Sequence, residues 1–274
     1  MMTDRRQADP LLSARLGDAI EKCNRGSVAV IPFLTPRERK QTERELRAAG
    51  AWKNAFFFGG YDDAERACLF LLPDYYNTML GKSPRECTVT ELSETLTEEL
   101  DEAVRAIRIV GSGYRTLSHR DYLGSILGLG LERDALGDIA VQNEHEAVVF
   151  CPKTISDFLI ENLQKIASDT VKCKPYTPDE TFTDGRNYRP ISDTVASPRL
   201  DCVVAALTNL SREAAQNAIR TGLVEVDFES EERADFPLTP PVTVSVRGYG
   251  RFILRSFDGE TRKGRLRMRA DQLI

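Results

Sequence analysis

The chain has 274 residues, of which 41% are hydrophobic and 29% charged, and its formal net charge is −5. This is the composition of an ordinary soluble globular protein. No apolar run has the length of a membrane span or, within residues 1–20, of a signal peptide, which excludes an integral membrane protein. We therefore expect a cytoplasmic protein with two or three domains of roughly 100 to 200 residues each.

The distribution of charge along the chain and the spacing of the cysteines both limit the kind of protein that this can be. Before Arg186 there are 23 basic and 30 acidic residues, and from Arg186 onward there are 14 basic and 12 acidic residues. The last third is therefore net basic in an acidic chain. The six cysteines are scattered without a C-x-x-C pair, so we predict free, mostly buried thiols rather than a disulfide framework or a zinc cluster.

Residues 1–80 are predicted to form a small α+β domain. The predicted elements are a strand at Ser27 to Leu34, a charged helix that begins at Thr35-Pro36 and ends near Gly50, and an antiparallel strand pair at Ala55 to Tyr61 and Ala67 to Pro73. The helix start is a strong signal, because threonine is a good N-cap and proline suits the first helical position.

Three aromatic residues in the first strand of that pair have two interpretations. Phe57, Phe58 and Tyr61 flank a Gly-Gly turn. They could stack on nucleobases, which is worth ~1–3 kcal/mol per base. The alternative, which we favour, is that they form part of the core beside a glycine turn.

Residues 81–178 alternate between strand and helix patterns. The predicted strands are Val104 to Val110, Gly137 to Gln142, Glu146 to Cys151 and Thr170 to Pro175, and the predicted helices are His119 to Leu129 and Thr154 to Ala167. The resulting order is β-α-β-β-α-β, that of a ferredoxin-like or RNA-recognition-motif sheet. The strand that begins at Glu146 offers only Phe150 for base stacking, which leaves RNA binding by this sheet open.

The two histidines do not support catalysis. His119-Arg120-Asp121 resembles a kinase triplet, but that pattern needs Asn five residues after Asp, where this chain has Ile126. We interpret His119 and Arg120 as a possible phosphate contact at a helix entrance, since helix N-terminal amides and a nearby cation suit anions. His145 is predicted to lie solvated in a turn, and no catalytic triad or metal site can be assembled.

Residues 179–194 are predicted to be a linker, because Asp184-Gly185 and Pro190 are turn-forming. Residues 195–274 are predicted to form two short helices and a β hairpin. The first helix carries an apolar face made of Leu200, Val203, Val204 and Leu207. Ser211 is a good N-cap for the second helix, and Gly222 is a plausible stop. The hairpin strands are Val242 to Val246 and Phe252 to Leu254.

Basic residues gather in this last segment. Arg212, Gln216 and Arg220 follow one another at a spacing of four, which puts them in one solvent-facing row. Between Ser245 and Arg269 there are eight Lys or Arg against two acids. A single arginine is well explained as solvated surface, but such a cluster is typical of a polyanion site. The residues that we predict to contact RNA are Arg199, Ser211, Arg212, Gln216, Arg220, Arg247, Arg251, Lys263 and Arg265.

The C-terminal motifs resemble a known RNA-binding module. Arg199-Leu200-Asp201, Ser211-Arg212 with Ala215, and then Ile219, Gly222 and Val224 are similar to the module named after protein four of the small ribosomal subunit. Two departures are present: Asp227 stands where the module carries Asn, and an acidic insert runs from Glu225 to Asp235 with six acids against Arg233. The insert would repel phosphate from the hairpin tip, and we expect it to leave the two-helix face unaffected.

The whole chain is similar to the bacterial YlmH family. The resemblance is carried, in order, by Phe57-Phe58-Gly59-Gly60-Tyr61, His119-Arg120-Asp121-Tyr122-Leu123-Gly124, Gly128-Leu129-Gly130, Gly137-Asp138-Ile139, Arg247-Gly248-Tyr249-Gly250-Arg251-Phe252 and Thr261-Arg262-Lys263-Gly264-Arg265. It implies an N-terminal domain, an RNA-recognition-motif-like middle domain and the C-terminal module. It further implies a cytoplasmic protein that binds the large ribosomal subunit and peptidyl-tRNA in ribosome-associated quality control of stalled translation.

The expected protein is thus an α+β, non-enzymatic factor that holds ribosomal RNA or tRNA by phosphate contacts and shape. We expect no cofactor, no metal, no membrane contact and no small-molecule substrate. One alternative is an RNA-modifying enzyme that uses the module for targeting, but no G-x-G-x-x-G motif follows a strand, and Gly128-x-Gly130 comes nearest. Another alternative is an adaptor whose N-terminal domain binds a protein, with an auxiliary RNA contact.

Overall fold

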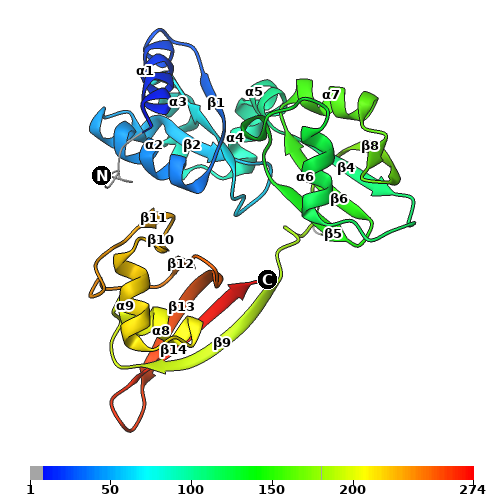
Figure 1. Ribbon diagram of the computed structural model, residues 1–274. Helices are drawn as coiled ribbons and strands as arrows, with labels where there is room; N and C mark the ends of the chain where they lie inside the picture. Colours follow the sequence, from blue (N-terminus) through cyan, green and yellow to red (C-terminus); the bar gives the residue numbers. More distant parts are fainter. Residues whose placement is uncertain (1–8, 180) are drawn as a thin grey trace. The chain divides into compact units, whose positions relative to one another are not determined.

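The computed structural model describes residues 9–179 and 181–274 (Figure 1). These residues divide into two compact units, one that ends at Gly185 and one from Arg186 to Ile274. Within the described residues the fold is α+β with three antiparallel sheets, which confirms the predicted class. None of the helices in this part of the chain has the length and apolar character to span a bilayer.

The first part of the larger unit is a three-stranded sheet with helices packed on it. Its helices and strands are α1 (Pro10–Asn24), β1 (Ala29–Leu34), α2 (Pro36–Ala48), β2 (Ala55–Phe58), β3 (Ala67–Leu71), α3 (Tyr75–Leu80), α4 (Val89–Thr95) and α5 (Thr97–Ala103). The strand order is β1-β3-β2. The predicted start of α2 is confirmed, because the Thr35 hydroxyl accepts from the Glu38 amide and the Glu38 carboxylate accepts from the Thr35 amide at 2.7 Å.

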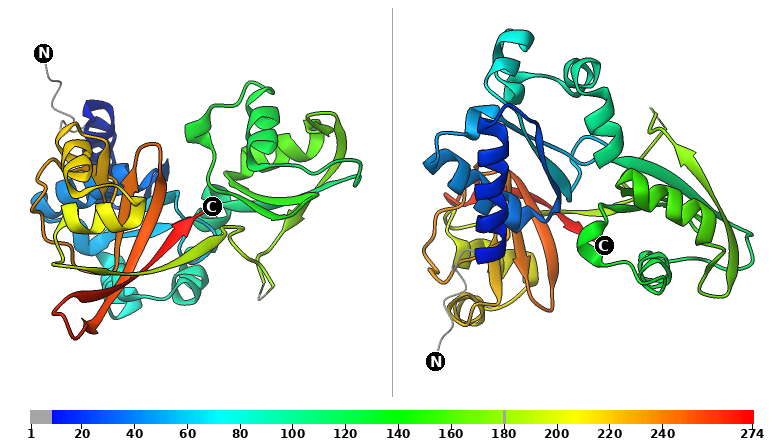
Figure 2. Two further views of the ribbon diagram at one scale, coloured as in Figure 1. Left: turned by 60° about the horizontal axis from the view of Figure 1, so that its bottom comes forward. Right: turned by 90° about the horizontal axis from the view of Figure 1, so that it is seen from above.

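The second part of this unit is a five-stranded sheet. Its elements are β4 (Arg105–Gly111), α6 (His119–Leu127), β5 (Ile139–Asn143), β6 (Glu146–Cys151), α7 (Lys153–Asn162), β7 (Lys165–Ile166) and β8 (Asp169–Tyr176). The predicted β-α-β-β-α-β order is present with β7 added, and the strands lie in the order β5-β6-β4-β8-β7. Both helices pack on one face of the sheet, over Ile107, Ile109 and Val149 (Figure 2).

Helix α7 is shorter than predicted. The apolar periodicity suggested a helix from Thr154 to Ala167, but the helix ends at Asn162. The next residues turn back and pair with the start of β8, where Ile166 lies opposite Asp169. Ala167 makes that turn with a φ of 51°. The apolar side chain of Ile166 therefore fills the core from a strand rather than from a helix.

The two parts of the larger unit share a core. One hydrophobic cluster contains Phe70 of the first sheet and Phe150 of the second, both fully buried. Asp138 adds polar contacts: its carboxylate accepts from the Tyr61 hydroxyl at 2.6 Å and from the Glu65 and Arg66 amides at 2.7 and 3.1 Å. The domain boundary expected near residue 80 therefore lies inside one compact unit.

The contacts of Phe57 and Tyr61 favour the core interpretation for these two residues. Phe57 packs beside Trp52 with ring centroids 6.1 Å apart, and the Arg39 guanidinium lies over its ring. Tyr61 packs on Phe150 at 4.9 Å. Because Phe150 is fully buried, it is not available to stack on a base, which removes the one stacking residue that the sequence offered on β6.

The smaller unit is a six-stranded sheet with two helices on one face (Figures 1 and 2). Its elements are β9 (Tyr188–Val195), α8 (Leu200–Thr208), α9 (Arg212–Arg220), β10 (Val224–Val226), β11 (Glu229–Ser230), β12 (Val242–Val246), β13 (Gly250–Glu260) and β14 (Leu266–Leu273). The strand order is β11-β10-β12-β13-β14-β9. The predicted apolar face of α8 is buried together with Ala215 and Ile219 of α9, against Val244, Phe252 and Leu254 of the sheet.

Strand β9 differs from the prediction. Residues 188–194 were expected to belong to a linker, but they pair along their whole length with β14. The strand lies at the sheet edge, where Pro190 costs no ladder bond and most side chains face solvent. An edge strand that buries only one residue fully has the composition of a linker. This explains why the sequence of β9 does not predict a strand.

Candidate nucleic-acid interface

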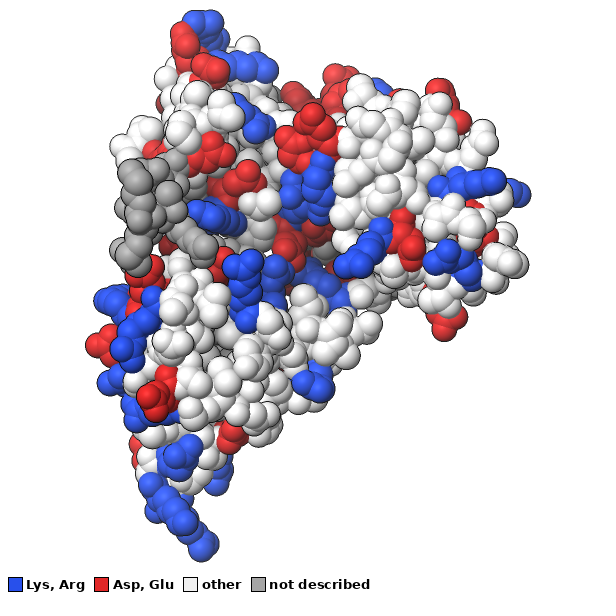
Figure 3. Space-filling model, in the orientation of Figure 1, with Lys and Arg blue, Asp and Glu red and all other residues white. Residues whose placement is uncertain are grey.

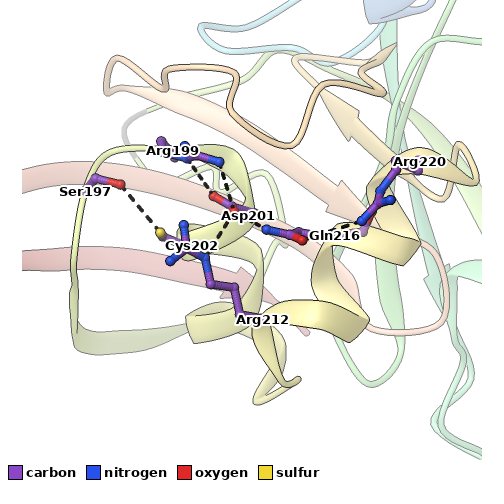
Figure 4. A network of polar contacts seen from close by, with 7 residues as sticks. All are labelled: Ser197, Arg199, Asp201, Cys202, Arg212, Gln216 and Arg220. Atoms are coloured by element: carbon purple, nitrogen blue, oxygen red, sulfur yellow. Dashed lines mark hydrogen bonds and ion pairs between the residues drawn. The ribbon is translucent and has the colours of Figure 1, made fainter.

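Helix α8 begins against a returning stretch of chain. The amides of Leu200 and Asp201 donate to the carbonyl oxygens of Phe236 and Ala234, each at 2.9 Å. The first amides of the helix are therefore paired with backbone. Asp201 is fully buried, and its carboxylate is directed toward side chains of α9 rather than toward its own helix (Figure 4).

The Asp201 carboxylate joins three side chains: Arg199 and Arg212 from the two helix starts and Gln216 from the middle of α9. It accepts from Arg199 Nε at 3.1 Å and Nη2 at 3.2 Å, from Arg212 Nε at 3.1 Å, and from Gln216 Nε2 at 2.8 Å. The side chains of Arg199 and Arg212 are 40% and 55% exposed. A buried anion thus holds two cations whose outer edges face water, and the terminal nitrogens of Arg212 take no part in the contact.

Asp201 is ionised at neutral pH. Burial by itself would raise its pKa, but the hydrogen bonds from Gln216, Arg199 and Arg212 outweigh burial and lower the pKa to about 2. The same contact raises the pKa of Arg199. The network therefore carries a fixed arrangement of charges with a net excess of one cation.

The predicted row along α9 is present, with one difference. Arg220 donates from Nε to the Gln216 carbonyl oxygen at 3.4 Å and from Nη2 to its side-chain oxygen at 3.5 Å. Gln216 therefore bridges Arg220 to Asp201 instead of facing solvent freely. Ser211 caps α9 as predicted, since its hydroxyl accepts from the Ala214 amide at 3.1 Å.

Arg247 and Arg251 lie at the turn between β12 and β13. The Arg247 amide donates to the Leu223 carbonyl oxygen at 2.9 Å, which ties this turn to the segment just after α9. The two arginines line an open cleft of about 470 Å³ together with Gly222 and Glu225. The Arg251 guanidinium lies 5.0 Å from the ring centroid of Phe228.

Lys263 and Arg265 lie elsewhere, at the end of the β13–β14 hairpin. Arg265 donates from Nε to the Thr194 hydroxyl at 3.0 Å, and Lys263 is exposed in the turn. Lysine and arginine atoms cover this end of the hairpin (Figure 3). Neither residue takes part in the Asp201 network. The nine predicted RNA contacts are thus divided among the two-helix row, the β12–β13 turn and the hairpin end.

The acidic insert lies closer to the two-helix face than expected. Ala234 of the insert and Phe236 just after it supply the carbonyl oxygens that pair with the start of α8. Asp235 also contributes to the raised pKa of Arg199. We expected the insert to affect only the hairpin tip, but its end borders Arg199, because this returning stretch is what closes the N-terminus of α8.

Asp227 stands where the module that the C-terminal motifs resemble carries Asn, and its local role suits either residue. The residue has a φ of 47°, a left-handed conformation that Asp and Asn tolerate best among non-glycine residues. Its carboxylate accepts from the Thr243 amide at 2.8 Å. An Asn side-chain oxygen could accept the same bond.

The expected phosphate contact at His119 and Arg120 lies at the start of α6, in the larger unit. There the Ser118 amide donates to the Asp121 carboxylate at 2.8 Å, and Ser118 caps the helix. The Asp121 carboxylate is therefore itself an anion at the helix start. Burial lowers the pKa of His119, and nearby Arg133 lowers it further, so the ring favours the neutral form. His145 lies in the β5–β6 turn, with Nδ1 3.0 Å from the Arg115 carbonyl oxygen.

Asp201, which organises the two-helix face, is not among the residues predicted to form the site. The sequence does contain a signal for a paired carboxylate at this position. Asp201 lies between Leu200 and Val204 at the border of the apolar face of a helix, so its side chain is expected to be partly enclosed. An enclosed carboxylate needs a hydrogen-bonding partner. Its partners lie 11 and 15 residues later, beyond the range of helical periodicity.

Comparison with known proteins gives three findings. Residues 101–180 match a family model described as "Putative RNA-binding domain in YlmH". Ribosome-associated protein quality control protein P2 of Bacillus subtilis (strain 168) is 27% identical over 237 residues, which cover 86% of this chain and 84% of that protein. The solved structure of cell division protein ylmH from Streptococcus pneumoniae is 18% identical, with a TM-score of 0.45, and covers 62% of this chain and 94% of that chain. The resemblance to the YlmH family is confirmed by the family model and the curated relative.

Proposed function

We propose that this chain is a non-enzymatic RNA-binding factor of ribosome-associated quality control, and that it binds RNA of the large ribosomal subunit and tRNA. The contacts are made by the two-helix face, with Arg199, Arg212 and Arg220 on phosphates and Ser211 and Gln216 nearby as hydrogen-bonding groups. Arg247, Arg251, Lys263 and Arg265 extend the contact along the smaller unit. The chain works in the cytoplasm.

The observation that carries this proposal is the buried, ionised Asp201 between two exposed arginines. A solvated surface arginine samples many rotamers and loses that freedom when it binds phosphate. Arg199 and Arg212 are already held, so less conformational entropy is lost when each meets a backbone phosphate. Guanidinium groups with free terminal nitrogens also suit bidentate phosphate contacts.

The comparisons support the biological setting. The relative from Bacillus subtilis carries the name of a ribosome-associated quality control protein, and residues 101–180 match an RNA-binding domain model. A factor that recognises RNA by shape and phosphate needs no catalytic group.

The proposal is tested by sedimenting the tagged chain from a bacterial lysate on a density gradient at low and moderate salt, with sequencing of the crosslinked RNA in each fraction. We expect co-migration with the large subunit and crosslinks to tRNA and to one region of ribosomal RNA. The full-length variant Arg199→Glu/Arg212→Glu should sediment freely. Arg15→Glu/Lys22→Glu on α1, which has the same change of charge at two exposed positions, should behave as the unsubstituted chain.

Two results would contradict the proposal. Co-migration that survives Arg199→Glu/Arg212→Glu would favour an adaptor that reaches the ribosome through a protein partner. A base modification that is missing from bulk RNA of cells without the gene, measured by mass spectrometry, would favour an RNA-modifying enzyme.

A further inference from the structure

The five-stranded sheet of the larger unit has a second face, opposite to α6 and α7. Side chains alternate along a strand, so the neighbours of buried Ile107 and Ile109 on β4 point to this face. Part of the face is covered by the first sheet, because Ala106, Val148 and Phe150 belong to the shared core. The rest of the face, over β4 and β8, is open.

The open part carries a basic row that ends at a tyrosine. Lys172 and Lys174 of β8 are exposed, and no contact of either ammonium group is present among the described residues. They lie opposite Val110 and Arg108 of β4. Residues two apart on a strand are separated by roughly 6.5–7 Å, so the lysines form a short line of positive charge. Tyr176 continues the line, with the Arg108 guanidinium 5.5 Å from its ring centroid.

Arg108 is only a partial contributor to this charge. It forms an ion pair with Glu146, whose side chain is nearly buried. Among the described residues, the two lysines are therefore the cations of the row without an ion-pair partner. The Arg108 guanidinium also lies over the Tyr176 ring.

Beyond Tyr176 the row opens into a cleft of about 600 Å³. Its walls combine aromatic rings with carboxylates. The lining includes Phe58, Tyr61, Tyr176, Asp62, Asp101 and Arg105. The Phe182 ring packs beside the lining, on the rings of Tyr61 at 5.0 Å and Phe150 at 5.7 Å. Phe58 and Tyr176 are partly buried, and both belong to the lining.

We propose that this cleft receives one unpaired nucleobase of an RNA strand whose backbone phosphates lie on Lys172 and Lys174. This inference rests on the proposed function, because it assumes that the chain binds RNA. The aromatic rim supplies the stacking surface that single-stranded RNA recognition uses. The lysine row supplies the charge that tracks a phosphate backbone.

The distribution of charge decides the orientation. Within the part of the chain that the structure describes, Asp62 is the exposed, uncompensated carboxylate of this lining, because Asp101 is paired with Arg105, which lines the same cleft and donates from Nε at 2.9 Å. Carboxylates repel phosphate but accept hydrogen bonds from the amino and imino groups of a base. The base therefore points into the cleft, and its phosphates stay on the lysines outside. A base in a duplex has its faces stacked and its edge paired, so the site selects an unpaired base.

The test uses the full chain and an unstructured ten-nucleotide oligouridine that carries one 4-thiouridine. Photocrosslinking followed by peptide mass spectrometry is expected to give adducts at Tyr176 or Phe58. Lys172→Glu/Lys174→Glu is expected to weaken binding at least tenfold and to lower the slope of log K against log salt by about 1.4, since each single-strand phosphate contact contributes about 0.7. Arg15→Glu/Lys22→Glu is the charge-matched control and should change neither.

Tyr176 provides an independent readout. Tyr176→Ala should abolish the crosslink in the cleft, and Tyr176→Phe, which keeps the ring, should retain the affinity. Loss of affinity in Tyr176→Phe equal to that in Tyr176→Ala would overturn the stacking role, and circular dichroism of both variants separates it from unfolding.

Three further results would overturn the proposal. Unchanged oligouridine binding in the lysine double variant excludes the phosphate path. Crosslinks confined to residues 195–274 exclude the cleft while leaving the proposed two-helix face intact. Uridine monophosphate that displaces the oligonucleotide with equal affinity would make the cleft a site for a free nucleotide. Conversely, cleft crosslinks that persist in Arg199→Glu/Arg212→Glu would support the cleft even if the two-helix face fails its own test.

Discussion

Replacement of Asp201 by Asn probes the two-helix face most directly, because it keeps the shape of the side chain and removes its charge. The carboxylate accepts four hydrogen bonds from Arg199, Arg212 and Gln216. An Asn side chain has one acceptor oxygen, and its amide would present donors to the guanidinium groups. The two arginines would therefore lose their common anchor and return to solvated rotamers.

The expected loss of stability follows from the pKa. The pKa of Asp201 falls from an ordinary value of 3.8 to about 2 in the folded chain. At 1.36 kcal/mol for each pKa unit, this corresponds to about 2 kcal/mol of stabilisation at neutral pH. Both arginine partners are about half exposed, so water replaces part of the lost contacts and the full energy of a buried ion pair is not expected.

The dependence on pH has a defined sign. Because the folded pKa is depressed, the contribution of Asp201 is fully present above about pH 4 and is lost as the pH falls through about 2. The difference in unfolding free energy between the unsubstituted chain and Asp201→Asn should thus be constant from pH 5 to 7 and shrink below pH 4. Urea unfolding monitored by circular dichroism measures it, with Asp193→Asn, an exposed carboxylate of β9, as the control.

The affinity for structured RNA distinguishes the effect of holding the two arginines in place from the effect of net charge. Asp201→Asn makes the smaller unit more positive by one charge, so attraction to phosphate alone predicts tighter binding. Loss of ordered arginines predicts weaker binding, by roughly tenfold or about 1.4 kcal/mol. Fluorescence anisotropy with a labelled ribosomal RNA hairpin decides between them. Tighter binding, or a stability difference that persists undiminished at pH 2, would refute the reasoning.

Three further substitutions test other parts of the structure. Arg199→Ala/Arg212→Ala should weaken binding across RNA sequences and reduce the salt slope by roughly 2, and an unchanged slope in a salt titration would count against this face. Ser211→Ala removes the N-cap of α9 and should cost about 1 kcal/mol in urea unfolding, whereas Ser211→Asp should retain the stability. Asp138→Ala leaves the Tyr61 hydroxyl and two backbone amides without their acceptor, and should lower the unfolding free energy by about 2–4 kcal/mol; a loss below 0.5 kcal/mol would show that water replaces the carboxylate.

Local features of this chain could be read from the sequence because their causes lie within a few residues. The caps Thr35 and Ser211 act on amides three positions away, and the apolar faces of α8 and α9 follow the helical repeat. The β-α-β-β-α-β order and the last hairpin follow from alternating patterns and turn residues in the same way. The concentration of basic residues in the last third is likewise a property of the sequence.

Tertiary structure decided which of these groups meet. Asp201 reaches partners on another helix, and β9 becomes a strand only because β14, more than 70 residues later, pairs with it. The same applies to the cleft, whose walls come from Phe58 and Tyr176 on different sheets, and to Phe150, which packing removes from solvent. Each of these contacts depends on burial and on pairing between residues far apart in the sequence. Burial and long-range pairing change the energy of a side chain, but they produce no periodic pattern in the residues around it.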